Sequence, residues 1–403
     1  MKVLLDDDAF DGQLLRVIGA MYERGADYGE SWSTANRIKA HDVESWYREW
    51  KSTAIRIENI AKAALEKNHR VSAHEAYLRA SMYHRASGQF FIGNSQETRT
   101  LVAYQNTARC FQEAMKLASE FKSETVSIPY KDGKSLPGYF LTPSNAGKTS
   151  GQTIIVNGGY DSVKEECYFF SGAAALRRGY NVLLFDGPGQ GLPLLADNLL
   201  TIPDWENVIT PVVDYLHTRG DVDKSKIAAL GISLGGYQIP RAATKEKRLA
   251  AIIVDPAQVN IGKKARARLP LPVSWRSTFP KNVPGIIVYI ISAMLGRMAA
   301  DPSGGWTLRR NLHVHGLKNA VDLFEEMDKF ELDPADVTCP VFISFAEKDV
   351  IASEAQEFYD KCGSQVKKFV QYKEEDGSHE HCEAGNRSSF NADWLDWLDE
   401  LWA

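Results

Sequence analysis

A change of hydrophobic period near residue 122 constrains the fold more than any other feature of this sequence. Before this point, apolar residues recur at steps of three or four, which places them on one face of an α-helix. After it, short apolar runs alternate with helical stretches, a pattern typical of a mostly parallel sheet with helices on both faces. Because 403 residues are long for one compact unit, we expect an all-helical domain over residues 1–122 and an α/β domain over residues 123–403. The clearest helical face carries Trp46, Trp50, Ala54, Ile57, Ala61 and Ala64.

The second part begins with a hairpin of two strands, and further strands follow at intervals filled by helical patterns. The interval between residues 254 and 341 has no strand pattern, so we expect residues 261–335 to form a helical insertion over the sheet. The expected strands are residues 124–129, 136–141, 153–156, 181–185, 226–230, 251–254, 341–345 and 368–372.

Two local patterns give narrower predictions. Ser72 and Glu75 have the spacing of a capping box, which predicts that a helix begins at Ser72. Residues 285–295 (GIIVYIISAML) form the most apolar window. This window falls short of the roughly 20 residues that span a bilayer, so it predicts a buried helix and no membrane contact.

Residues 231–235 match the pattern Gly-x-Ser-x-Gly, with Ser233 at its centre. In this pattern a serine occupies a sharp turn between a strand and a helix, and the glycines relieve the crowding that the turn creates. The N-terminus of the following helix favours negative charge that develops beside it. The pentapeptide is short, but here it follows an expected strand and precedes a helical pattern over residues 237–244. The sequence therefore predicts that Ser233 is a nucleophile.

Two loops lie where a nucleophilic serine needs them. Residues 157–162 (NGGYDS) follow the strand 153–156, so the N–H groups of Leu234 and of Tyr160, or of Gly159 in its place, are expected to form an oxyanion hole. Residues 186–191 (DGPGQG) follow another strand and are interpreted as a structural loop at the edge of the site. They lack the Lys-Ser/Thr of a phosphate-binding loop.

The acid and the base are expected after Ser233 in the chain, in that order. Asp349 follows the strand 341–345, and Asp255, which follows the strand 251–254, is the alternative acid. His379 and His381 are both candidates for the base. A His-x-His pair also suits a metal, but no third and fourth ligands accompany it, so we expect no metal.

Composition excludes some classes of function. A formal net charge of −5 without a basic stripe argues against nucleic acid. Five dispersed cysteines with no Cys-x-x-Cys pair indicate free thiols in a reducing compartment. The acidic N-terminus has no signal-peptide pattern, so we expect a cytoplasmic protein. We also expect that the protein needs no cofactor.

Several segments of the chain are similar to a known family. They are residues 46–50 (WYREW), 77–85 (YLRASMYHR), 157–162, 186–191, 231–236 (GISLGG) and 381–383 (HCE). Together they resemble 2,6-dihydroxypseudooxynicotine hydrolase and the fungal heptaketide hydrolases of the yellowish-green pigment type. The resemblance implies an α/β-hydrolase fold with an N-terminal all-helical cap domain. It also implies a triad of Ser233, Asp349 and His381, because the histidine of that family is followed by cysteine; His379 stays the alternative.

The resemblance implies hydrolysis of a carbon–carbon bond next to a ketone, in an aromatic or polyketide-type small molecule, through an acyl-enzyme. The same triad also suits an esterase, lactonase, transacylase or cyclase, and a non-catalytic receptor of the same fold is a further alternative. We expect a homodimer formed through the helical domain. Aromatic residues of the covering helices are candidates for a substrate pocket, although Trp46 and Trp50 are better explained as helix-packing core. The other candidates are Tyr83, Trp275 and Trp306.

Overall fold

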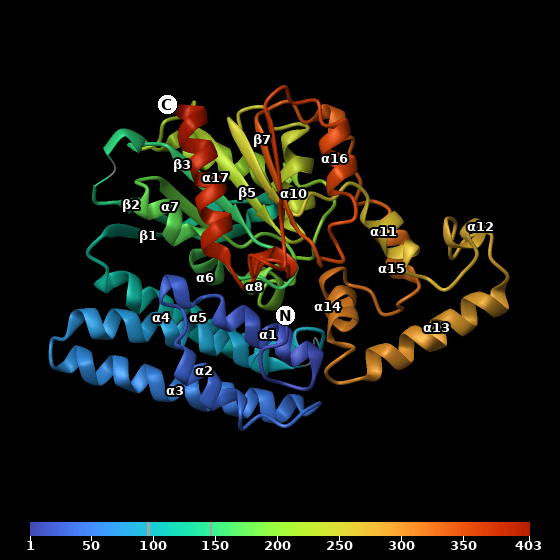
Figure 1. The fold of residues 1–403 in the computed structure, drawn as a ribbon, viewed down its shortest axis with the longest axis horizontal. Coiled ribbons are helices and arrows are strands. Elements are labelled where there is room, and N and C mark those ends of the chain that lie inside the picture. The colour runs from blue at the N-terminus through green and yellow to red at the C-terminus, as the bar shows by residue number, and fades with distance from the viewer. Residues whose placement is uncertain (95–96, 146) are drawn as a thin grey trace.

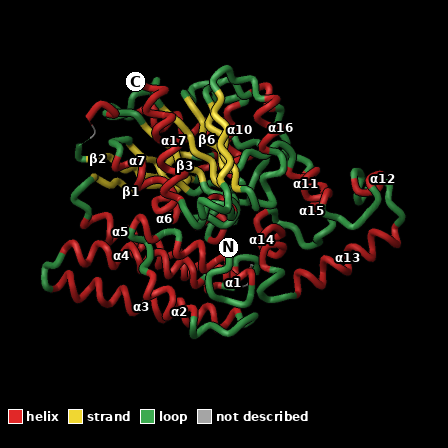
Figure 2. The backbone as a smooth tube through the Cα atoms, viewed as in Figure 1, coloured by secondary structure: helices red, strands yellow, loops and turns green. Residues whose placement is uncertain are grey.

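A computed structural model describes residues 1–94, 97–145 and 147–403. A central sheet lies between layers of helices, and the N-terminal helices lie together below it in the view of Figure 1. Figure 2 shows the strands in yellow, enclosed by helices in red. The N-terminal helices are α1 (Asp8–Ile18), α2 (Tyr28–Ala35), α3 (Val43–Glu66), α4 (Arg70–Ser87) and α5 (Thr98–Leu117).

Helices α3 and α4 form a helical hairpin that builds the aromatic core of this region. Trp46 and Trp50 are fully buried, as the helical pattern predicted, and the indole N–H of Trp46 donates to the carbonyl of Ala86 at 2.8 Å. The predicted helix start at Ser72 is wrong, because α4 already begins at Arg70. Asn68 adopts a left-handed φ of 58° in the short turn after α3, and this tight reversal starts the next helix two residues early.

The sheet has eight strands in the order β1-β2-β4-β3-β5-β6-β7-β8. Strands β1 and β2 form the predicted hairpin, β2 pairs antiparallel with β4, and all remaining pairs are parallel. The predicted strands are confirmed, with ends that differ by up to three residues. The strands are β1 (Phe121–Pro129), β2 (Ser135–Pro143), β3 (Thr153–Asn157), β4 (Asn181–Phe185), β5 (Ile227–Ile232), β6 (Ala251–Asp255), β7 (Val341–Ala346) and β8 (Lys367–Tyr372).

Two hydrophobic clusters cover the two faces of the sheet. Successive residues of β3 alternate between them: Ile154 and Val156 belong to one cluster, and Ile155 belongs to the other. The first cluster also contains Trp46 and Trp50, so the N-terminal helices and one face of the sheet share a continuous core. The helices around the sheet are α6 (Lys164–Cys167), α7 (Ala173–Arg177), α8 (Gly191–Leu195), α9 (Glu206–Thr218), α10 (Gly235–Ala243), α16 (Ala355–Lys361) and α17 (Arg387–Trp402).

The segment between β6 and β7 is helical, and its outer part has a small core of its own. Leu269, Phe279, Ile291, Leu295 and Phe324 belong to this third cluster. The insertion projects from one side of the molecule in Figure 1. Its helices are α11 (Ile261–Ala267), α12 (Val273–Arg276), α13 (Gly285–Ala300), α14 (Trp306–Val314) and α15 (Asp322–Met327).

Helix α13 corrects the prediction of a buried helix at residues 285–295. Ile291 and Leu295 are buried, but Ile286 and Tyr289 are 65% and 71% exposed. Only one stripe of α13 packs against the third cluster, and most of the other side chains of this helix are exposed. None of the helices in the described chain combines the length and the apolarity needed to cross a bilayer.

Candidate active site

Ser233 lies in the sharp turn between β5 and α10. Its φ is +61°, a left-handed conformation that is strained for a residue with a side chain, and its N–H donates to the carbonyl of Asp255 at 2.7 Å. The turn leaves no room for a side chain at the neighbouring positions Gly231 and Gly236. A Cβ atom at Gly231 would lie 2.1 Å from the carbonyl oxygen of Gly235, and one at Gly236 would lie 1.9 Å from that of Pro256. The sequence therefore folds into the nucleophile elbow, with the Ser233 hydroxyl projecting from it.

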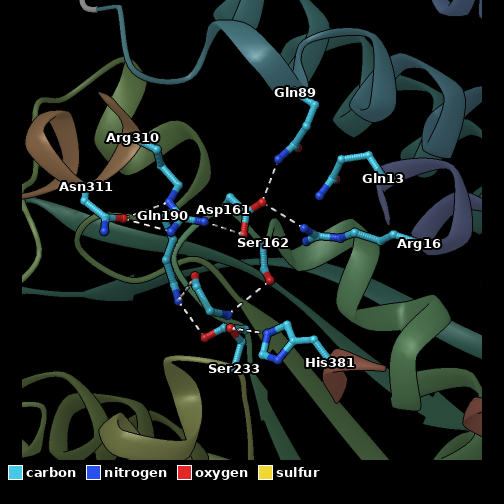
Figure 3. A network of polar contacts seen from close by, with 12 residues as sticks. Gln13, Arg16, Gln89, Asp161, Ser162, Gln190, Ser233, Arg310, Asn311 and His381 are labelled. Atoms are coloured by element: carbon cyan, nitrogen blue, oxygen red, sulfur yellow. Dashed lines mark hydrogen bonds and ion pairs between the residues drawn. The ribbon is translucent and has the colours of Figure 1, made fainter. Parts of the chain in front are cut away.

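The structure brings His381 and Asp349 to Ser233. His381 follows β8 and Asp349 follows β7, at the carboxyl ends of their strands. The His381 Nε2 atom lies 2.9 Å from Ser233 Oγ, and its Nδ1 atom lies 2.7 Å from Asp349 Oδ2. Asp349 Oδ1 accepts the N–H of Ile351 at 2.9 Å, which fixes the carboxylate. Figure 3 shows Ser233 and His381 facing each other beneath the loop that follows β3.

Opposite charges within this group set its protonation. Burial would raise the pKa of Asp349, but the charge and hydrogen bond of His381 outweigh it and lower that pKa below its ordinary value. The surrounding protein disfavours the charged ring of His381 and so lowers the pKa of this histidine. The charge and the hydrogen bond of Asp349 outweigh this effect and raise the pKa of His381 above the ordinary value. Asp349 is therefore ionised at neutral pH and accepts from Nδ1–H, which leaves Nε2 free to take a proton from Ser233.

The two alternative residues lie elsewhere. The His379 side chain is buried and its Nε2 atom lies 3.4 Å from the Glu380 carboxylate, while its backbone carbonyl accepts from Lys348. Asp255 is fully buried behind the elbow. Burial raises the pKa of Asp255 above its ordinary value. Asp349, and not Asp255, thus bonds to the histidine beside Ser233.

The backbone N–H groups expected to form an oxyanion hole belong to the loop after β3 and to Leu234, which follows Ser233 in the chain. Gly159 lies against Ser233, since a Cβ atom on it would be 2.7 Å from Ser233 Cβ. The Gly159 N–H already donates to Ser162 Oγ at 3.1 Å, so it does not serve as a free donor. Within the described chain, no protein group accepts from the N–H of Tyr160 or of Leu234. These two N–H groups remain available to a ligand.

A buried cluster of charges holds the far end of the same loop, and sequence reasoning missed it. Arg16 of α1 donates to Asp161 Oδ2 at 2.8 Å and to Glu166 Oε1 at 2.7 Å. Arg85 of α4 donates to the Asp161 carbonyl at 3.1 Å, and Arg310 of α14 lies 3.5 Å from Asp161 Oδ1. Figure 3 shows Arg16 and Arg310 approaching Asp161 from different parts of the chain. The cluster ties the N-terminal helices and the insertion to the loop beside Ser233.

The N-terminal helices also bring three potential metal ligands together. Among the described residues, Glu58, His84 and Cys110 place ligand atoms within 4.8 Å of one another. However, Arg109 donates to both Glu58 oxygens, at 2.9 and 2.7 Å, and Lys62 also pairs with this carboxylate. Two cations already balance the single carboxylate, so the chemistry of this group does not favour a metal ion.

A sheet of this order, with a serine elbow after β5 and an acid and a histidine after later strands, defines an α/β-hydrolase. The chain matches the Alpha/beta hydrolase family over residues 154–385 and belongs to that family. It is an enzyme of this class, and the curated proteins that it resembles are named hydrolases.

The similarity extends over the whole chain, including the N-terminal helices. The alpha/beta hydrolase xenA of Xenoacremonium sinensis is 35% identical over 353 residues, which cover 83% of this chain and 81% of that protein. The 20-hydroxy-prefusarin hydrolase FUS2 of Gibberella moniliformis is 30% identical over 420 residues, which cover 100% of this chain and 99% of the relative. The crystal structure of 2,6-dihydroxy-pseudo-oxynicotine hydrolase has the same fold, with a TM-score of 0.74, 22% identity and 94% coverage of both chains. The resemblance inferred from the residues is confirmed.

Proposed function

We propose that Ser233, His381 and Asp349 form a catalytic triad that hydrolyses a carbon–carbon bond next to a ketone in an aromatic or polyketide-type small molecule. The observation that carries this proposal is the continuous hydrogen-bonded chain from Asp349 through His381 to Ser233 Oγ, built on a strained elbow. The His381 side chain is 46% exposed, so a substrate reaches Ser233 from solvent.

In the first step, His381 Nε2 takes the proton of Ser233 Oγ as this oxygen attacks the ketone carbon. The carbonyl oxygen becomes an oxyanion, and the N–H groups of Leu234 and Tyr160 stabilise it. Removing one such donor costs about 10²–10³ in kcat, roughly 3–4 kcal/mol of transition-state stabilisation. Asp349 stabilises the imidazolium that forms on His381 and keeps it oriented.

In the second step, the tetrahedral intermediate collapses and the carbon–carbon bond breaks. The electron pair leaves with the departing carbon, which is stable enough only when a neighbouring carbonyl or aromatic ring delocalises it as an enolate or phenolate. The proton on His381 passes to this leaving group. Water, deprotonated by His381, then attacks the acyl-Ser233 ester and releases a carboxylic acid.

The names of the similar proteins support the substrate class. They specify 20-hydroxy-prefusarin and 2,6-dihydroxy-pseudo-oxynicotine, both small organic molecules. Attack on the carbonyl is the same in carbon–carbon and ester cleavage, and only the leaving group differs. The preference for carbon–carbon cleavage therefore rests on the family resemblance.

The test compares a β-diketone polyketide with an ester of the same carbon skeleton. Each is incubated with the wild-type enzyme and with Ser233→Ala, and the acid released is followed by mass spectrometry. We expect acid from the diketone with the wild-type enzyme and none with the variant. Turnover of the ester alone would overturn carbon–carbon cleavage and favour an esterase.

A further inference from the structure

Gln190 lies in the loop after β4, and its buried side chain reaches across to the loop after β3. Its Nε2 atom donates to the carbonyl of Gly158 at 2.9 Å and to that of Gly159 at 3.1 Å. Its Oε1 atom accepts the N–H of Gly187 at 2.9 Å, and this contact fixes which end of the amide faces the two carbonyls. Figure 3 shows Gln190 directed at the backbone above Ser233.

One of these contacts sets the direction of a neighbouring donor. The carbonyl of Gly159 and the N–H of Tyr160 belong to the same peptide group. In a planar trans peptide these two bonds point in opposite directions. Because Gln190 holds the Gly159 carbonyl, the Tyr160 N–H points away from Gln190 and is not free to rotate.

The loop needs such a restraint because of its glycines. Gly158 and Gly159 are adjacent, and residues without a Cβ atom adopt many backbone conformations at little cost. The loop has little spare room, since a Cβ atom on Gly158 would lie 2.4 Å from that of Ser162. Two glycines beside Ser233 permit this close approach, but they also permit the peptide between Gly159 and Tyr160 to flip. A fixed hydrogen-bond donor removes that freedom.

We propose that Gln190 is a positioning residue that aims the Tyr160 N–H at the oxyanion formed by attack of Ser233. This inference rests on the proposed function. Gln190 does not touch the reacting atoms, and it acts only through the Gly159–Tyr160 peptide. Loss of its amide donor lowers the stability of the transition state while ground-state binding of the substrate is unchanged.

Two substitutions test the role of the amide donor. Gln190→Met keeps the length of the side chain and removes the donor, and Gln190→Glu keeps its shape but directs carboxylate oxygens at two carbonyl oxygens. We expect kcat to fall at least tenfold in both, with KM within about threefold of the wild-type value, because a misaimed oxyanion donor costs up to about 10²–10³. Gln152→Glu is the matched control, because Gln152 is also a buried glutamine but lies before β3, at the opposite end of that strand.

The pH dependence of Gln190→Glu distinguishes a role of the hydrogen-bond donor at this position from a role in packing alone. Burial beside two carbonyls raises the pKa of the introduced carboxyl, and its protonated form again donates a hydrogen bond. The ratio of variant to wild-type activity should therefore rise as the pH falls from 8 to 5.5. A role in packing alone predicts a constant ratio, and that result would overturn the inference, as would wild-type kcat in Gln190→Met.

The decisive measurement is the rate of labelling by a fluorophosphonate, which reacts with an activated serine without needing the natural substrate. We expect rapid labelling of the wild-type enzyme and Gln152→Glu, slow labelling of both Gln190 variants, and none of Ser233→Ala. Wild-type rates in folded Gln190 variants would overturn the inference about Gln190 alone. Failure of the wild-type enzyme to label would overturn the nucleophile proposal, and the inference with it.

Discussion

Two histidines lie two residues apart in the chain, but only His381 contacts Ser233 Oγ. We expect His381→Gln to lower kcat/KM by about 10³-fold or more, because a serine hydroxyl without a base is a weak nucleophile. His379→Gln is the matched control and should retain activity within a few-fold, since His379 is directed at Glu380. Steady-state kinetics of the two variants decide the assignment, and equal losses would contradict it.

The proposed role of His381 predicts how activity depends on pH. His381 acts as a base only when neutral, and Asp349 raises its pKa above the ordinary value of about 6.5. The acid limb of kcat/KM should therefore have its midpoint above about pH 6.5, and activity is lost as the pH falls through it. In Asp349→Asn the negative charge is gone, so the midpoint should move to lower pH while the plateau falls by about 10⁴-fold. A midpoint that stays in place would contradict the link between the two side chains.

At this scale the sequence indicates the residues whose roles follow from motif and order, and it misses those whose roles come from distant contacts. Ser233 could be singled out from its motif, whereas chain order left Asp349 or Asp255 as the acid and His379 or His381 as the base. The family resemblance favoured Asp349 and His381. Arg16 could not, because its partners Asp161 and Glu166 lie 145 and 150 residues away. Gln190 belongs to a loop that was interpreted as structural, and nothing in the sequence indicates which carbonyls it holds.

Helix α1 contacts the loop beside Ser233 through Arg16, which donates to Asp161. Burial would raise the pKa of Asp161, but Arg16 and its neighbouring arginines hold it well below the ordinary value, so the pair is ionised. Arg16→Ala leaves Asp161 and Glu166 short of one buried counter-charge, and we expect it to lower the free energy of unfolding by about 3–5 kcal/mol. Lys361→Ala, at a pair with Glu357 in which the two side chains are 60% and 32% exposed, should cost much less. Urea unfolding measures both, and equal losses would show that the buried cluster adds nothing.

Element types could be predicted from the sequence more readily than their surroundings. Strands β3 to β8 are short apolar runs, and their order in the chain predicts a covered parallel sheet. Helix α13 shows where this reasoning fails. Its apolar residues predict a helix, but periodicity does not reveal whether a neighbour covers each face, and most side chains of α13 are exposed. The start of α4 fails for a local reason, because the turn at Asn68 takes precedence over the capping pattern.

For the whole molecule, the shared core predicts how the protein unfolds. Trp46 and Trp50 of the N-terminal helices and Trp394 of α17 belong to one hydrophobic cluster with strands of the sheet. We expect one cooperative transition, because neither part keeps its apolar surface covered without the other. Calorimetry should give equal van 't Hoff and calorimetric enthalpies. Tryptophan fluorescence and far-ultraviolet circular dichroism should give the same midpoint for the wild-type protein. Two separated midpoints would show that the helical region is stable by itself.

A homodimer formed through the helical region stays a prediction, and sedimentation velocity of the full chain measures it. The covered face of these helices is the one that packs against the sheet, which leaves their outer face for any second copy.

The separate core of the insertion bears on how such an enzyme changes over evolutionary time. Leu269, Phe279 and Phe324 pack with Ile291 and Leu295, and none of these side chains belongs to the clusters on the two faces of the sheet. New side chains on the outer surface of this segment therefore leave the elbow and the strands undisturbed. Residues 269–295, which come before Trp306 and Arg310, are the part of the insertion where an engineer could change the outer surface without disturbing the contacts around Asp161.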